Sequence, residues 1–319
     1  MLKPRHAVLF GILAICAGGA LAQGWPARPI RIISPFPPGG GIDASARLVA
    51  QALTEQLGQS VVVDNKPGAS GRIGTDIASK AASDGYTLLL GSIGPNAIIP
   101  SAAAKLPYDS LRDFAPVSLV ASTEYTLVVH PNLPVRSLED LLQLAKAKPG
   151  AITYASSGNL LASHLAGELL SITGSVQIVH VAYKGTGPAA VSVITGETVM
   201  AFGSGPSVAP HVHAKRLRAI ATTGRKRTAP DLPTMSETLP GYEVTQWYGV
   251  LVPAGTAQPI VNALNKEIGR AVETPKFAQQ FSNIGAEPVS TTPQEFGAII
   301  KADIEKWGRV IRAAHIHVD

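Results

Sequence analysis

Three consecutive glycines, Gly39 to Gly41, stand between an apolar run and an amphipathic stretch in "SPFPPGGGIDASARLV" (residues 34–49). The three prolines before them fix φ and delay the start of a helix. The glycines allow positive φ and let a ligand come close to the backbone. We expect a helix to begin near Asp43, so that its free N–H groups and its dipole favour an anion. The stretch therefore predicts a site for a phosphate or a carboxylate.

The same loop fits a dinucleotide fingerprint, written Gly39-x-Gly41-x-x-Ala44, with Asp64 at the end of the next apolar run. A dinucleotide-binding oxidoreductase is therefore an alternative. Two features count against it: the export signal described below, and a proline-rich approach that is longer than the tight first turn of that fold. In a purely structural interpretation Asp43 only caps the helix, which leaves the three glycines unexplained.

Two later loops have a similar composition. "DNKPGASGRIGTDIA" (residues 64–78) follows an apolar run and has glycines at positions 68, 71 and 74. In "YASSGNLLASHLAGELL" (residues 154–170), the polar stretch Ser156-Ser157-Gly158-Asn159 lies between a predicted strand and a predicted helix. Hydroxyls and free amides at this position either meet an anion or only cap the helix, and the sequence leaves both interpretations open.

The first 22 residues have the pattern of a secretory signal peptide. A basic start is followed by the apolar run 7–17 and by Ala20-Leu21-Ala22, so we expect cleavage after Ala22 and a periplasmic location. A lipid anchor on Cys16 is disfavoured, because Ile15 stands where a small residue is expected. Cleavage leaves 319 − 22 = 297 residues, no cysteine and a formal charge reduced from +5 to +3. Nothing in this composition points to nucleic acid.

Patterns of hydrolytic or metal chemistry are weak or missing. The chain has neither a Gly-x-Ser-x-Gly elbow nor a Ser-x-x-Lys pair. His164 falls in an apolar helical stretch, where packing or capping is the expected role. The pairs His211-x-His213 and His315-x-His317 lack acidic partners nearby, so we predict no metal site. We therefore expect a binding protein without a cofactor, and an exported enzyme stays the alternative.

Short β-branched runs alternate with helical patterns, which indicates βαβ units and an α/β fold. The last helical stretch has an apolar seam at residues 296, 300, 304, 307 and 311. Strands are predicted at 30–33, 61–63, 87–90, 126–129, 152–154, 177–181, 199–202 and 217–221. Helices are predicted at 44–57, 138–147, 164–172 and 188–194.

Two stretches, 115–125 and 224–243, interrupt this alternation. They favour two domains, 23–122 plus 241–319 and 123–240, with chain crossings near 122–126 and 224–247. A small ligand would then lie in the cleft between the domains, at the carboxyl ends of the strands. Glu124 stands beside the first crossing, where it faces either a ligand amine or the water around a hinge.

Motifs along nearly the whole chain resemble those of the substrate-binding proteins of tripartite tricarboxylate transporters, the Bug family. They include "PFPPGGGIDASAR", "VVVDNKPGASGRIG", "DGYTLLLG", "LPYDSLRDFAPVSLVAS", "ITYASSGN", "AYKGTGPA", "LPTMSETLPGYEVTQWYG" and "IEKWGRVIRAA". The resemblance implies a Venus-flytrap fold of the type II kind with two interdomain crossings. It also implies a monomer that carries a small carboxylate to membrane subunits of such a transporter.

The resemblance also implies which residues hold the ligand, mostly through loop backbone. Carried over by position, they are Phe36, Gly39, Gly40, Asp43, Ala69, Ser70, Ser156, Ser157, Gly158, Asn159, Tyr183 and Gly185. The chain departs from the family pattern at Leu160 and Leu161, where small or polar residues are usual, and at Gly203, where an acidic residue is common. We expect these departures near the far end of the ligand. If Leu160 or Leu161 faces the cleft, they favour a carboxylate with an apolar or aromatic body over an amino acid; the alternative, which their spacing also permits, is that both leucines point into the helix core.

Overall fold

The computed structural model describes residues 24–102, 105–227 and 230–316. The predicted signal peptide, Cys16 and His317 lie outside these residues. Within them, no helix is both long enough and apolar enough to cross a membrane. The strands are β1 (Ile30–Ser34), β2 (Val61–Asn65), β3 (Thr87–Ser92), β4 (Phe114–Val129), β5 (Ile152–Ser156), β6 (Ile178–Ala182), β7 (Met200–Ser204), β8 (Arg218–Thr222), β9 (Thr245–Pro253) and β10 (Glu287–Pro288).

Helices alternate with these strands along most of the chain, as the sequence predicts. They are α1 (Gly41–Leu57), α2 (Arg72–Ser79), α3 (Ile99–Ala102), α4 (Leu138–Ala147), α5 (Ala162–Gly174), α6 (Thr186–Ile194), α7 (Gly205–His213), α8 (Met235–Thr238), α9 (Gln258–Val272), α10 (Pro275–Asn283) and α11 (Pro293–Ala313). Two short helical turns, η1 (Ala69–Gly71) and η2 (Gly94–Ile98), follow β2 and β3.

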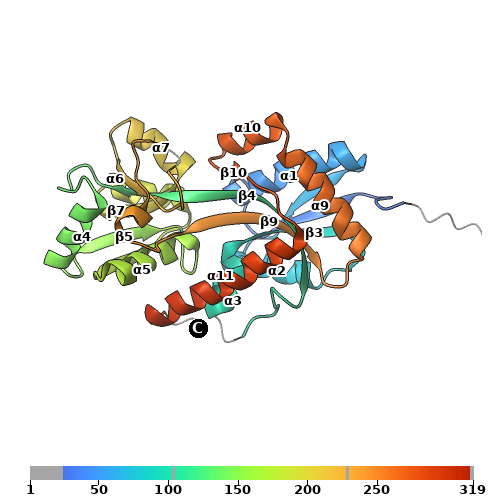
Figure 1. The fold of residues 1–319 in the computed structure, drawn as a ribbon, viewed down its shortest axis with the longest axis horizontal. Coiled ribbons are helices and arrows are strands. Elements are labelled where there is room, and N and C mark those ends of the chain that lie inside the picture. Colours follow the sequence, from blue (N-terminus) through green and yellow to red (C-terminus); the bar gives the residue numbers. More distant parts are fainter. Residues whose placement is uncertain (1–23, 103–104, 228–229, 317–319) are drawn as a thin grey trace, which may run out of the picture.

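The strands form a hydrogen-bonded path in the order β2-β1-β3-β9-β4-β7-β5-β6, with β8 and β10 paired to β4. Strand β4 belongs to two parts of it: residues 114–124 pair with β9, whereas residues 125–129 pair with β7 and β8. We call β1, β2, β3, β9, β10 and residues 114–124 the first section, and β5 to β8 with residues 125–129 the second section. Figure 1 shows β4 and β9 running along the middle of the elongated molecule, between the two groups of helices.

The crossing segments are more regular than the sequence indicates. The predicted interruption at 115–125 is wrong, because these residues belong to the long strand β4, and β9 is a strand that we did not predict. Pro116, which cannot donate to a ladder, lies at a register shift of the β4–β9 pairing. Strand β4 changes partners between Glu124 and Tyr125, inside the predicted crossing at 122–126. The division into two domains at the stated boundaries stays a prediction.

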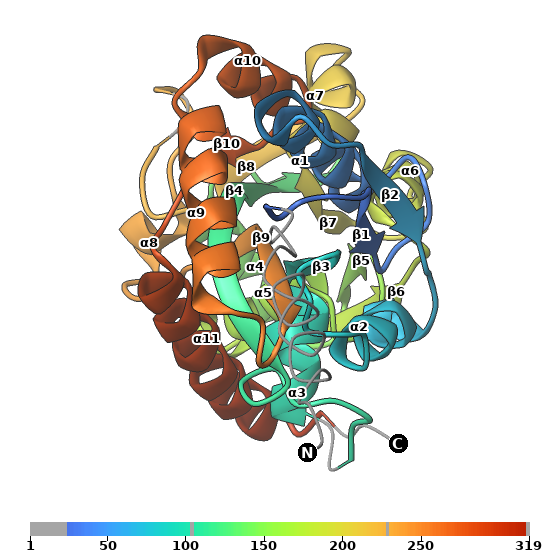
Figure 2. The same ribbon diagram turned by 90° about the vertical axis from the view of Figure 1, so that its right-hand side faces the viewer.

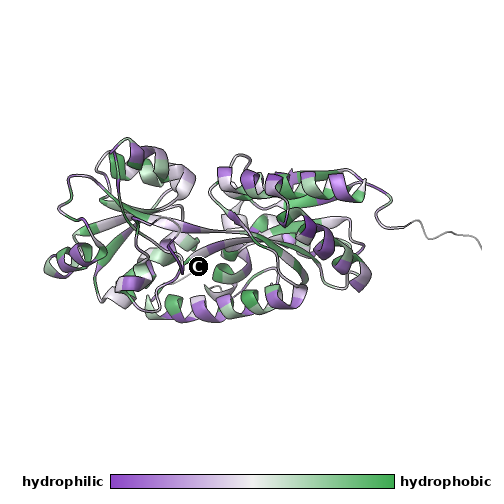
Figure 3. Cartoon of the chain, turned by 45° about the horizontal axis from the view of Figure 1, so that its top comes forward, coloured by the Kyte–Doolittle hydropathy of each residue, from purple (hydrophilic) through white to green (hydrophobic). Residues whose placement is uncertain are grey.

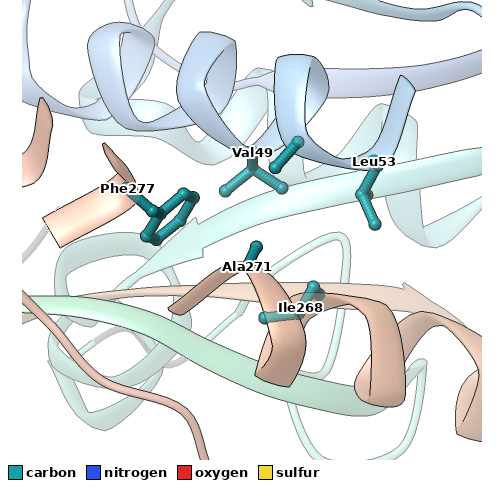
Figure 4. Close-up of a pocket in the computed structure, with 6 residues that line it drawn as sticks. Val49, Leu53, Ile268, Ala271 and Phe277 are labelled. Carbon is teal, nitrogen blue, oxygen red and sulfur yellow. The ribbon is translucent and has the colours of Figure 1, made fainter. Parts of the chain in front are cut away.

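Helices cover both faces of the first section (Figure 2). On one face α1, α9 and α10 enclose a dry apolar seam, lined by Val49, Leu53, Ile268, Ala271 and Phe277 and too narrow for a water molecule (Figure 4). In Figure 3 the strands are mostly green within each section, the crossing part of β4 and β9 is pale to purple, and the outer helices show both colours. The seam is therefore core packing and not a ligand site.

The opposite face carries α11, whose predicted apolar seam is confirmed. Phe296, Ile300, Trp307 and Ile311 are each at most 4% exposed, and Ile304 packs beside them. These side chains belong to a core cluster that also contains residues of α5 and β7 from the second section. Helix α11 therefore packs against elements of both sections.

Candidate functional site

A cavity of about 890 Å³ lies between the two sections. Its wall includes the segments that follow the carboxyl ends of β1, β2, β3, β5, β6 and β7, and its remaining residues come from β4, β9 and the end of α10. The lining residues are Phe36, Pro37, Pro38, Gly39, Gly40, Gly41, Ile42, Ala44, Ser70, Ser92, Gly94, Thr123, Tyr125, Ser157, Gly158, Leu161, Tyr183, Lys184, Gly185, Thr186, Gly187, Ser204, Pro206, Ser207, Gln246, Tyr248, Asn283 and Ile284. The loops that the sequence singled out thus meet at one place.

Three helices begin at this cavity. The N-cap residues of α1, α6 and α7 are Gly40, Gly185 and Ser204, and none of them provides a side-chain cap. All three residues line the cavity. The first N–H groups of a helix have no partner within the helix, and they carry the positive end of its dipole. The three helix ends together favour a negatively charged ligand.

Hydroxyl groups surround the ends of α6 and α7. Thr186 Oγ1 lies 2.8 Å from Ser207 Oγ, and Ser204 Oγ lies 2.9 Å from Ser207 Oγ. Each hydroxyl has one proton to donate and two lone pairs. The cluster can therefore turn a proton toward an anionic oxygen while it keeps its internal hydrogen bonds.

The structure corrects the expectation that α1 begins near Asp43 with Asp43 as its cap. The helix begins at Gly41, and Asp43 lies in its first turn, 3% exposed and outside the cavity lining. The Asp43 carboxylate accepts hydrogen bonds from Gly39 N–H at 2.9 Å, Arg47 Nε at 3.0 Å and Asn65 Nδ2 at 2.9 Å. Burial raises the pKa of Asp43, but the hydrogen bonds from Arg47, Gly39 and Asn65 outweigh burial and lower it. Asp43 thus holds the glycine loop from within the protein and does not line the cavity.

Within that loop only Gly39 uses the left-handed freedom of glycine, with φ of 87°. Gly40 has φ −86° and ψ 170°, an extended conformation that any residue adopts. A Cβ atom on Gly40 would meet nothing within 4 Å. The absence of a side chain at Gly40 therefore keeps space open at the cavity wall and is not required by the backbone.

The second loop is strained. Ala69 and Ser70 have φ of 48° and 55°, between Gly68 at 135° and Gly71 at 91°. Left-handed φ costs a non-glycine residue roughly 1–2 kcal/mol, and such strain is concentrated at functional sites. Ser70 lines the cavity, whereas Ala69 is exposed and does not.

The third loop divides its residues between the cavity and the interior. Ser157 and Gly158 line the cavity, but Ser156 is fully buried and its Oγ accepts a hydrogen bond from Gly158 N–H at 3.2 Å. Asn159 is exposed and lies outside the lining. Leu160 packs against the core and Leu161 lines the cavity.

Three other predicted residues differ in their relation to the cavity. Gly203 does not line it, and a Cβ there would overlap the side chain of Val208, so a larger residue at this position would require Val208 to move. Glu124 lies beside Gly224 and also does not line the cavity. Tyr183 lines it, and its hydroxyl is buried.

Several lining residues escaped prediction because they lie on unpredicted elements. Thr123, Tyr125, Gln246 and Tyr248 belong to the crossing strands. Ser204 ends β7, just past its predicted bounds, and Pro206 and Ser207 lie in the first turn of α7. The strand-end rule that identified the other loops also applies to the end of β7, and it would have indicated this segment.

The lining is electrostatically simple. Among the described residues that line the cavity, Lys184 is the one charged side chain, and no carboxylate is present. No group of three or more metal-ligating side chains occurs among the described residues. His164 is packed, as predicted: it is 6% exposed and accepts a hydrogen bond from Leu160 N–H.

Known proteins with the same architecture bind carboxylates. The Bordetella pertussis protein BugT is 38% identical over 315 residues, which cover 97% of both chains. The R. palustris protein Rpa4515, solved with adipate, is 34% identical with a TM-score of 0.83, covering 92% of this chain and 99% of its own. MatC (Rpa3494) from Rhodopseudomonas palustris, solved with bound malate, is 27% identical with a TM-score of 0.78, covering 90% and 99%.

These likenesses confirm the predicted periplasmic-binding-protein fold. The relatives are solute receptors and not enzymes, so they give no support to the oxidoreductase alternative. Residues 45–316 match the family described as "Tripartite tricarboxylate transporter family receptor". The chain therefore belongs to this family of periplasmic receptors.

Proposed function

We propose that this protein captures a small carboxylate in the cavity between its two sections and delivers it to the membrane subunits of a tripartite tricarboxylate transporter. The observation that supports this most is the convergence of the uncapped ends of α1, α6 and α7 on one cavity without a carboxylate side chain. Helix N-termini bind carboxylates as they bind phosphates. The adipate and malate found in the two solved relatives are carboxylates of the size such a cavity admits.

In this proposal the ligand is held mainly by backbone. The amides of Gly40 to Ile42 approach it from the first section, with Ser70 beside them. Ser157, Gly158 and Gly185 approach it from the second section. Phe36 and Tyr183 supply apolar walls. Because the ligand contacts both sections, it stabilises the arrangement in which they are close.

The two sections act as the two predicted domains, 23–122 plus 241–319 and 123–240. Strand β4 changes partners between Glu124 and Tyr125, and the second connection returns to the first section at β9. We propose that bending at these two places opens and closes the cavity. Hinges are typically a few residues at the ends of elements, as here.

The ligand has an apolar or aromatic body. A free amino acid would bring an ammonium group into a cavity whose described lining has no carboxylate to pair with it, and burying an unpaired charge is costly. Leu161 adds apolar surface to this lining. Its side chain lies close to Gly94, where a Cβ atom would come within 3.2 Å of Leu161 Cδ2. The preference against an amino acid, which the sequence attributed partly to Gly203, therefore rests on the absence of a carboxylate from the whole described lining.

Gly40→Val tests the site. Valine adds bulk toward the open space beside Gly40 without requiring positive φ. Calorimetry with adipate, malate, benzoate and aspartate should find at least one carboxylate bound by the wild type. For Gly40→Val the affinity should fall at least tenfold, which is about 1.4 kcal/mol, while the melting temperature is unchanged.

Gly40→Ala serves as the graded control, with a smaller loss. Undiminished binding by folded Gly40→Val protein would reject the loop assignment. Absence of binding to every carboxylate by the wild type would reject the proposed function.

Leu161→Ser tests the ligand class. Burial of a leucine-sized contact is worth about 1.5–3 kcal/mol, so the affinity for an apolar carboxylate should fall tenfold or more. Leu160→Ser is the control, because Leu160 packs against the core and not into the cavity, so its loss should lower stability more than selectivity. Tight binding of aspartate without any response to adipate or benzoate would contradict the preference.

Export and assembly belong to the same proposal. We infer cleavage after Ala22, which the mass of the protein recovered from the periplasm tests directly. The mature protein should elute as a monomer in size-exclusion chromatography. A retained signal segment or a stable dimer would contradict these two inferences without affecting the binding site.

A further inference from the structure

Two histidine rings lie stacked beneath the third loop, residues 156–161. His164 on α5 and His180 on β6 have ring centroids 3.9 Å apart and planes inclined by 16°. Neither histidine lines the cavity, but both contact the loop that does. His164 Nδ1 accepts a hydrogen bond from Leu160 N–H at 3.1 Å. His180 Nε2 lies 2.6 Å from Ser156 Oγ, which in turn accepts Gly158 N–H.

Two more titratable groups face the pair. Glu168 Oε1 lies 3.6 Å from His164 Nε2, on the same helix. The Tyr154 hydroxyl, from β5, donates to Glu168 Oε1 at 2.6 Å and lies 3.1 Å from the carbonyl oxygen of His164. The Tyr154 ring also lies 5.0 Å from the His180 ring. The loop thus rests on a buried polar network and not on apolar packing alone.

The geometry requires a neutral His164. Since Nδ1 accepts the Leu160 N–H, the ring proton is on Nε2 and faces Glu168. A second proton, on Nδ1, would point an N–H of His164 at the N–H of Leu160, and the hydrogen bond between them would be lost. Protonation of both rings would also place two cations face to face. Burial lowers the pKa of His164 to about 3, helped by His180, and burial lowers the pKa of His180 to about 4.

We propose that the stacked pair His164–His180 positions the 156–161 loop for the ligand and makes capture depend on both rings being neutral. The link to capture rests on the proposed function, whereas the link to the loop does not. Opening the loop exposes both rings to water and returns their pKa toward 6.5, so the two rings bind more protons in the opened loop between about pH 4 and pH 6.5. Burial raises the pKa of Glu168, which offsets part of this uptake. The closed loop is therefore fully stable above pH 6.5 and loses stability as the pH falls.

The first test needs no ligand. Amide exchange of Gly158 and Leu160 is measured by NMR from pH 7.5 to pH 4.5 and corrected for the intrinsic exchange rate. Protection should fall by at least tenfold between pH 6.5 and pH 5, because each ring that takes up a proton on opening contributes a factor of about ten. Ring nitrogen shifts should show His164 in its neutral Nε2–H form at pH 5.5. A charged His164 ring at pH 5.5, or protection that does not depend on pH, would overturn the proposal.

A double variant, His164→Asn with His180→Gln, separates titration from packing. Asparagine places an oxygen near the position of Nδ1, and glutamine places an amide near Nε2, so both contacts stay and neither side chain titrates. We expect wild-type protection at pH 7.5 that no longer falls at acid pH. If protection in the double variant fell at acid pH as much as in the wild type, the proposal would be overturned. The control His213→Gln, at an exposed position, should behave as the wild type. If the double variant does not fold, the ring nitrogen shifts of His164 in the wild type decide whether the ring is neutral at pH 5.5.

A second arm measures adipate affinity by calorimetry at pH 7.5 and pH 5.5. From pH 7.5 to pH 5.5 the wild type should lose more affinity for adipate than the double variant. Protonation of adipate itself affects both proteins equally, so it does not contribute to the difference. Equal losses would overturn the link to capture. If the wild type binds no carboxylate at pH 7.5, the proposed function fails, while the exchange measurement still decides whether the pair positions the loop.

Discussion

Asp43 lies under the glycine loop, beside the cavity but not in it. Its carboxylate ties the first turn of α1 to Gly39 and, through Asn65, to the end of β2. The Asn65 amide also donates to the Phe36 carbonyl at 3.0 Å. One buried carboxylate, with the Asn65 amide beside it, therefore fixes the approach to α1. Its charge is balanced by Arg47, at 3.0 Å.

Replacing this carboxylate should lower stability in a pH-dependent way. Asp43→Asn leaves an amide facing the Asn65 amide and loses charge-assisted hydrogen bonds, so the free energy of unfolding at pH 7 should fall by about 1–3 kcal/mol. Because the pKa of Asp43 is lowered in the folded state, its contribution is present above about pH 4 and is lost as the pH falls further. Urea unfolding at pH 7 and pH 3 should show this difference shrink.

Glu55→Gln is the matched control, because Glu55 forms an exposed ion pair with Lys276 and such pairs contribute little. A difference between wild type and Asp43→Asn that stays the same at pH 3 would contradict the assigned role.

At the scale of elements, local patterns predicted more than long-range pairing did. The boundaries of α4 agree with the prediction at 138–147, because a capping box at Ser137 and Asp140 marks its start. Strands β1, β2 and β3 were found from their apolar runs within a few residues. The crossing strands were not found from the sequence. Pro116 and the mixture of polar and apolar residues around Glu124 resemble a linker, and only the pairing with β9 shows that they form a strand. The cavity residues on β4 and β9 were missed for the same reason.

The ends of α6 and α7 offer a test of how helix termini hold the ligand. Thr186→Val removes one hydroxyl of the cluster with Ser204 and Ser207 while keeping the shape of the side chain. A hydrogen bond to a charged group contributes about 1.5–3 kcal/mol, so carboxylate affinity should fall by about tenfold or more. Thr195→Val, just beyond the opposite end of α6, is the control and should bind as the wild type. Equal affinities for Thr186→Val and the wild type would exclude a contact between this hydroxyl and the ligand.

At the scale of the whole molecule, the two sections share one core. The largest apolar cluster contains Leu89 of β3 and Trp307 of α11, together with Leu165 of α5 and Phe202 of β7. Tyr242, on the way to β9, adds a hydrogen bond of 2.8 Å from its hydroxyl to the carbonyl oxygen of Ala166 in the second section. The bending proposed at the crossings must therefore leave this core in place, with most of the movement on the cavity side.

A shared core predicts that both sections unfold together. All three tryptophans, Trp25, Trp247 and Trp307, lie outside the second section, so their fluorescence reports on the first section and α11. Leu165→Ala removes a fully buried side chain from the second section, which should cost about 2–5 kcal/mol. In urea, the midpoint from fluorescence should fall as far as the midpoint from circular dichroism, in a single transition. A fluorescence midpoint that Leu165→Ala leaves unchanged would instead show two independently folding domains, with α11 belonging to the first alone.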